Sequence, residues 1–202
     1  MAAFAGLQAE VKAEDATFVQ SFVAPACINS VTSEHLNITV MRTPYSRLAL
    51  SIIYPAEYPE APLIVELTST TLPKPLLKKK EQECNAKVAE HMEKVAKGEG
   101  KKGMLGQVRL VFCYLQDFIQ ENLFVPCWKE LKQVMTLFES ANSANKITID
   151  DKTGAITARL KCQGYFQILK IRVPDLYPEE GIKVSSILSV FSVDSSACFE
   201  RR

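Results

Sequence analysis

The sequence predicts an α+β fold, an antiparallel meander sheet flanked by helices, that is built twice along the chain, with the second copy incomplete. Three observations predict this fold. A short motif of proline and tyrosine occurs twice. Runs of alternating apolar and polar residues precede each copy of the motif, as in half-buried strands. Stripes of apolar residues at helical spacing lie before and after the first set of runs and before the second.

The repeated motif matches at four positions. The first copy has Pro55, Tyr58, Pro59 and Glu60, and the second has Pro174, Tyr177, Pro178 and Glu179 with the same spacing. Pro62 completes the first copy, whereas Gly181 stands at the matching position of the second. Two segments with one plan indicate two copies of a small domain, which we place at residues 1–124 and 125–202.

The residues of the motif predict a structural role. Proline fixes φ and has no N–H, so Pro59, Pro62 and Pro178 are expected to end strand pairing and to impose rigid turns. The rings of Tyr58 and Tyr177 can pack over these turns while each hydroxyl finds a backbone partner. We therefore expect neither tyrosine to be catalytic.

The first copy is predicted to run helix, meander, helix, helix. A helix is expected over residues 6–22, ended by Pro25. Alternating residues predict strands at 36–40 and 48–52, and the apolar residues 63–67 predict a further strand. A strand near Ile28 and Val31 would come before them, so the meander is expected to have three or four strands. Apolar residues at helical spacing then predict one helix from residue 76 and another over residues 104–122. The acidic pair Glu14 and Asp15 is interpreted as charge on a helix surface.

The second copy is predicted to repeat the helix and the meander. Pro126 is well placed to begin the helix. A turn at residues 151–154 predicts a hairpin, and further strands are expected at 165–173 and 182–193. Only 18 of the 202 residues follow Val184, too few for the two closing helices of the first copy. The second copy is therefore expected to be incomplete, or to have its sheet covered by another part of the chain or by another protein.

Composition argues against several classes of function. The net charge of +1 creates no overall field toward nucleic acid or an anionic membrane. No apolar stretch approaches the roughly 18 residues of a membrane span, and no secretory signal begins the sequence. The six cysteines are scattered without Cys-x-x-Cys spacing, and there are two histidines, so neither a metal nor another cofactor is expected. Free thiols in the cytoplasm or nucleus are the expectation.

The order of helix, meander, Tyr-Pro-x-x-Pro and two helices resembles the RWD domain. Residues 7–124 match that plan along their length, and residues 126–193 resemble its first two-thirds. The resemblance implies a fold related to ubiquitin-conjugating enzymes. It also implies a protein-binding role in ubiquitin-pathway ligases, translation-control kinases or kinetochore assemblies. We therefore predict a non-catalytic interaction module, a scaffold or adaptor, with a structural subunit of a larger assembly as another hypothesis.

Four apolar residues of the second sheet are the candidate partner-binding positions: Leu169, Ile171, Val184 and Ile187. They lack the helices that would close the domain, so a second chain or the first domain is expected to cover them. The edge of the meander could also pair with a strand of a partner. The expected partner is a protein, and an oligomer is one form that such cover could take.

An enzyme of the ubiquitin-conjugating type that uses Cys84 is the alternative. Resemblance to those enzymes implies a His-Pro-Asn element and a nucleophilic cysteine beyond the proline motif. The chain has no His-Pro dipeptide, but Cys84 follows Tyr58 by 26 residues. Lys79 and Lys80 would lower the pKa of an exposed thiol there. Since Cys84 shares a helical stripe with Val88, we expect it to be a core residue.

Overall fold

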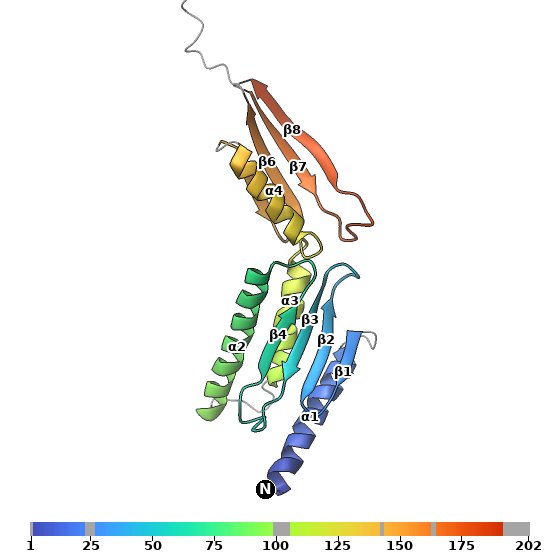
Figure 1. Cartoon of the computed structure of the whole chain (residues 1–202), viewed down its shortest axis with the longest axis vertical. Helices are drawn as coiled ribbons and strands as arrows, with labels where there is room; N and C mark the ends of the chain where they lie inside the picture. The colour runs from blue at the N-terminus through green and yellow to red at the C-terminus, as the bar shows by residue number, and fades with distance from the viewer. Residues whose placement is uncertain (1, 23–26, 99–105, 142–143, 163–164, 192–202) are drawn as a thin grey trace, which may run out of the picture. The chain divides into compact units, whose positions relative to one another are not determined.

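The computed structural model describes residues 2–22, 27–98, 106–141, 144–162 and 165–191 (Figure 1). These residues form an α+β protein with two four-stranded antiparallel sheets and four helices. They divide into two compact units, Met1–Gln120 and Glu121–Arg202, which we call unit 1 and unit 2. None of the helices among the described residues combines the length and the apolar character that crossing a bilayer requires.

Unit 1 begins and ends with helices and has a meander between them. Its elements are α1 (Ala2–Phe22), β1 (Ile28–Val31), β2 (His35–Met41), β3 (Arg47–Ile53), β4 (Ile64–Thr68), α2 (Lys74–Ala96) and α3 (Gln107–Glu121). The strands lie in the order β1-β2-β3-β4, each antiparallel to the next. The strands expected at 36–40, 48–52 and 63–67 are confirmed, and β1 makes the meander four-stranded. Alternation in β2 and β3 places every second side chain on the buried face.

The core of unit 1 lies between one face of this sheet and its helices. Strands β2, β3 and β4 bury alternate residues, among them Ile38, Leu50 and Val65. From α2, Cys84 and Val88 are fully buried, and α3 adds its apolar stripe. Figure 1 shows α2 running beside β4, the last strand of the sheet. The helices therefore cover the face formed by β2, β3 and β4, with α2 at the edge that β4 forms.

Unit 2 has one helix followed by a meander. Its elements are α4 (Trp128–Ala141), β5 (Lys146–Asp150), β6 (Ala155–Cys162), β7 (Tyr165–Arg172) and β8 (Lys183–Phe191), with the strands in the order β5-β6-β7-β8. Figure 1 shows α4 lying over one face of this sheet. A core of buried residues joins the two: Phe124, Cys127, Leu131, Ile156 and Val173. Among the described residues of unit 2, no helix follows β8.

The start of α4 differs from the sequence expectation. Helix α4 begins at Trp128, not at Pro126, because the preceding residues form turns that bury Phe124 and hydrogen-bond Leu123 N–H to the carbonyl of Asp151 at 3.0 Å. The hairpin turn beyond Asp151 requires a glycine at position 154, because φ there is +63°. A Cβ added to Gly154 would also lie only 3.1 Å from Leu123 Cδ1. Residues 99–105, where the last helix of the first copy was expected to begin, and 192–193 lie outside the described residues.

Candidate functional site

The two copies of the motif occupy the same place in the two sheets. The first lies between β3 and β4, and the second lies between β7 and β8. The backbone N–H of Tyr58 bonds to the carbonyl of Pro55 at 3.1 Å, and that of Tyr177 bonds to the carbonyl of Pro174 at 3.2 Å. Both Tyr-Pro peptide bonds are cis. The motif therefore forms the same turn twice, at the end of the third strand of each meander.

Each tyrosine ties this turn to the helix that precedes its sheet. The hydroxyl of Tyr58 donates to Asp15 Oδ2 of α1 at 2.6 Å, and that of Tyr177 donates to Glu130 Oε2 of α4 at 2.6 Å. The expectation of a backbone partner was therefore wrong, because a carboxylate accepts in both units. The interpretation of Asp15 as a surface charge was also wrong, since only 7% of it is exposed.

The two pairs differ in how deeply they are buried. Burial raises the pKa of Asp15 from 3.8 to about 6, an effect opposed by the Tyr58 hydrogen bond and increased by Glu14. Burial, and then the charge of Asp15, also raise the pKa of Tyr58. The pKa of Tyr177 rises to about 12, chiefly because its hydroxyl is bonded to Glu130. Both phenols therefore keep their protons at neutral pH and serve as donors.

The shared motif aligns the last strands of the two sheets. Counting from the tyrosines, Leu63 matches Ile182, and Val65 matches Val184. The pairing agrees, because Val65 lies opposite Ile52 and Val184 lies opposite Ile171. Their exposure does not agree: Leu63 and Val65 are 2% and 3% exposed, whereas Ile182 and Val184 are 50% and 56% exposed. Matching positions of one fold plan are thus covered in unit 1 and open in unit 2.

The edge of β4 is covered by polar side chains as well. The backbone N–H of Leu63 donates to Gln107 Oε1 of α3 at 2.9 Å, that of Val65 to Asn85 Oδ1 of α2 at 3.3 Å, and that of Leu67 to Glu81 Oε1 of α2 at 2.8 Å. Strand β8 is likewise the last strand of its sheet. No side chain among the described residues accepts a hydrogen bond from the backbone of Val184 or Ser186. Unit 2 therefore presents an edge strand whose outward N–H groups lack side-chain caps.

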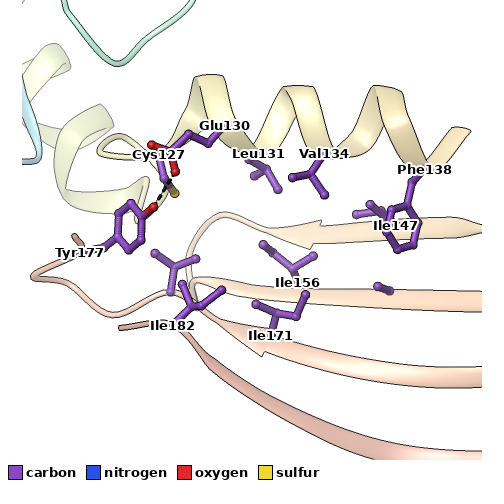
Figure 2. A pocket seen from close by; sticks show the side chains of 12 residues that line it. Cys127, Glu130, Leu131, Val134, Phe138, Ile147, Ile156, Ile171, Tyr177 and Ile182 are labelled. Carbon is purple, nitrogen blue, oxygen red and sulfur yellow. Dashed lines mark hydrogen bonds between the residues drawn. The ribbon is translucent and has the colours of Figure 1, made fainter. Parts of the chain in front are cut away.

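An apolar groove of about 150 Å³ lies between α4 and strands β5, β6 and β7, and Ile182, the residue before β8, also lines it. Figure 2 shows Leu131 and Val134 of α4 directed toward Ile156 and Ile171 of the strands, and Phe138 beside Ile147. Glu130 and Tyr177 lie at one end of the groove, joined by their hydrogen bond, with Ile182 beside them. Together with the exposed Val184, the groove forms the surface that we call the open face of unit 2.

The candidate binding residues share this surface in part. Ile171 lines the groove, and Leu169, two residues earlier on β7, points to the same side as Ile171 and is half-buried. Val184 pairs with Ile171 and is exposed. The side chain of Ile187 lies outside the described residues, although its backbone belongs to β8. Sequence reasoning missed Ile182, whose signal is its match to the core residue Leu63.

Cys84 has the surroundings of a core residue. Its exposure is 0%, and burial raises the pKa of its thiol to about 12 despite the opposing charges of Lys80 and Lys87. Lys80 is itself bonded to Glu83 at 2.7 Å and to the Tyr114 hydroxyl at 2.8 Å. The acidifying effect expected from the neighbouring lysines is therefore outweighed. No group of three His, Cys, Asp or Glu side chains within the described residues is placed to hold a metal ion.

Comparison of the chain with protein-family models, with curated proteins and with solved structures gave no match.

Proposed function

We propose that this chain is a non-catalytic protein-interaction module with two RWD-like domains, and that it binds a protein through the open face of unit 2. The repeated plan supports the pair of domains. Each unit has a helix, a four-stranded meander, a Tyr-Pro turn after the third strand and a tyrosine bonded to a carboxylate of the preceding helix. The RWD resemblance supports a scaffold or adaptor role in a ubiquitin-pathway, translation-control or kinetochore-type assembly in the cytoplasm or nucleus.

The observation that carries the binding proposal is the contrast between Val65 and Val184. They hold matching positions, and their exposures are 3% and 56%. Covering an exposed Val or Ile side chain fully is worth about 1.5–3 kcal/mol, so the open positions of β8 and the neighbouring groove offer a partner a substantial apolar contact. Exposed apolar patches beside a groove are typical of interaction surfaces.

A photo-crosslinking residue placed at position 184 tests the proposal in cells. The matched control is position 64, because Ile64 is 50% exposed on the other face of β4 in unit 1. We expect position 184, but not position 64, to form a discrete adduct with another protein chain. The second substitution Ile182→Lys should abolish that adduct. Identical adduct patterns from the two positions would contradict a binding role for the open face.

The buried thiol of Cys84 supports the non-catalytic role over the alternative of a ubiquitin-conjugating enzyme. A nucleophilic cysteine must be ionised and accessible, and Cys84 is 0% exposed with its pKa raised to about 12. Incubation with ubiquitin-activating enzyme, ubiquitin and ATP tests this choice. A reducible ubiquitin adduct that disappears in Cys84→Ala would overturn it.

A further inference from the structure

We propose that the partner of the open face supplies an amphipathic helix that lies along β8 as α2 lies along β4. This inference rests on the proposed function and specifies the chemistry of the partner. The helix carries carboxylate or amide side chains at positions i and i+4, which accept hydrogen bonds from the backbone of Val184 and Ser186. Its neighbouring apolar residues cover Ile182 and Val184.

Unit 1 shows how a helix caps an edge strand of this plan. Glu81 and Asn85 lie four residues apart on α2 and accept from Leu67 and Val65, which lie two residues apart on β4. Four helical residues rise about 6.0 Å, and two strand residues span about 6.6 Å. One turn of helix therefore matches the spacing between successive outward N–H groups. The order of the contacts shows that the helix runs antiparallel to the strand.

The same helix covers the apolar side of the strand. Leu77, Cys84 and Val88 of α2 are 8%, 0% and 0% exposed, and they share the core with Val65. The stripe lies next to the two capping residues: Glu81 follows Leu77 by four residues and precedes Cys84 by three, and Asn85 precedes Val88 by three. A partner helix with the same arrangement would cap the edge of β8 and bury Val184 in a single contact.

The charges around β8 favour acidic caps over amide caps. Lys183 of β8 is exposed and pairs across the sheet with the exposed Arg172 of β7. The matching residues of unit 1 are the uncharged Ile64 and Ile53. A carboxylate at the edge of β8 would interact with these cations and with the N–H groups together. We therefore assign the partner an acidic amphipathic helix.

The test uses the full chain and labelled 23-residue peptides with the sequence of α2, Lys74–Ala96, made acidic by replacing the exposed Lys78, Lys79 and Lys94 with Glu. Three peptides are compared: this parent sequence, the parent with Asn85→Glu, and the parent with the double change Glu81→Ala/Asn85→Ala. Fluorescence anisotropy gives the affinity, and amide NMR shifts of Val184 and Ser186 locate the contact. We expect saturable binding, tighter for Asn85→Glu and about tenfold weaker for the double variant, because two capping bonds are lost.

Two variants of the chain show where the peptide binds. Val184→Lys should weaken binding about tenfold, since it places a charge in the apolar contact. Ile64→Lys is the matched control and should leave the affinity unchanged, because the residue matching Ile64 in unit 2 is itself a lysine, Lys183. Circular dichroism confirms that both variants fold. Binding that is insensitive to Val184→Lys would overturn the proposal, as it would place the peptide elsewhere.

Other outcomes separate this inference from the function on which it rests. If no peptide binds while position 184 still cross-links to a protein, the helix is wrong and the binding role stands. If the double variant binds as tightly as the parent peptide, the proposed capping hydrogen bonds are wrong. Sedimentation that shows a dimer dissociated by Val184→Lys would overturn the acidic helix in favour of a second copy of the chain. Failure of both peptide binding and cross-linking would remove the proposed function as well.

Discussion

The hydroxyl of Tyr58 donates a 2.6 Å hydrogen bond to the carboxylate of Asp15, across the core of unit 1. Tyr177 and Glu130 repeat this relationship in unit 2 at the same distance. The first pair is buried, and the second lies at the end of an open groove. The same tyrosine–carboxylate hydrogen bond is therefore a core contact in unit 1 and part of an exposed surface in unit 2.

Removing the tyrosine hydroxyls should reveal this difference in burial. Tyr58→Phe leaves the carboxylate of Asp15 buried without its donor, so we expect a loss of about 1–3 kcal/mol in the free energy of unfolding. Tyr177→Phe should cost about 0.5 kcal/mol or less, because water can replace the donor to Glu130. Urea denaturation followed by circular dichroism measures both. Equal losses would show that the two pairs share one environment.

The raised pKa of Asp15 predicts how stability depends on pH. Because the pKa is about 6 in the folded state and 3.8 ordinarily, the folded state binds more protons between these values. The free energy of unfolding should therefore fall as pH rises from about 4 to 6, by about 3 kcal/mol from this group. Carboxylates with lowered pKa, such as Glu83, act in the opposite direction. The difference between wild type and Asp15→Asn isolates the effect, and parallel pH curves for the two would contradict it.

Truncation of Val65 and of Val184, which hold matching positions, should lower the free energy of unfolding by different amounts. Val65→Ala removes buried methyl groups from unit 1, and we expect it to cost about 2 kcal/mol. Val184→Ala should stay within about 0.5 kcal/mol, because its side chain is already exposed to solvent. Circular dichroism follows both units, and the fluorescence of Trp128, the one tryptophan of the chain, follows unit 2. A cost for Val184→Ala as large as that for Val65→Ala would mean that β8 is covered in the free chain.

The cysteines should differ in reactivity. Cys84 is fully buried and its pKa is raised to about 12, so we expect no labelling by iodoacetamide at pH 8 in the folded chain. Cys113 is half-buried and serves as the comparison, with faster labelling. Mass spectrometry of digested protein locates the label. Modification of Cys84 at the rate of Cys113 would show that the thiol is accessible and would revive the enzyme alternative.

Much of the fold could be predicted because its signals are local. The alternation of residues 36–40 and 48–52 reproduces the buried face of β2 and β3, and the stripe of Leu131 and Phe138 reproduces α4. Phe22, at the end of the expected first helix, is 64% exposed, and its ring contacts that of Phe18 in a tilted arrangement with a centroid separation of 4.7 Å. Periodicity identifies the apolar face of a helix or strand, but it does not show how much of that face other elements bury.

The polar contacts of the site were harder to predict. Asp15 lies four residues after Val11 and four before Val19, so a carboxylate on an apolar helical stripe was the available signal, and Glu130 lies similarly before Val134. The side chains that accept hydrogen bonds from the backbone of β4 had no such signal in the sequence. Glu81, Asn85 and Gln107 are brought to the strand by tertiary packing over many residues of chain. No local pattern distinguishes them from solvated helix residues.

Amide hydrogen exchange of the free chain at Val65 and Val184 tests the central claim most directly. The claim is that two copies of one fold plan differ in the cover of their last strand. The N–H of Val65 is bonded to Asn85, so its exchange should be slow and should approach the global stability of unit 1. The N–H of Val184 should exchange orders of magnitude faster, and should become protected when a partner helix binds. Equally slow exchange at both amides would show that β8 is already covered and would contradict the account.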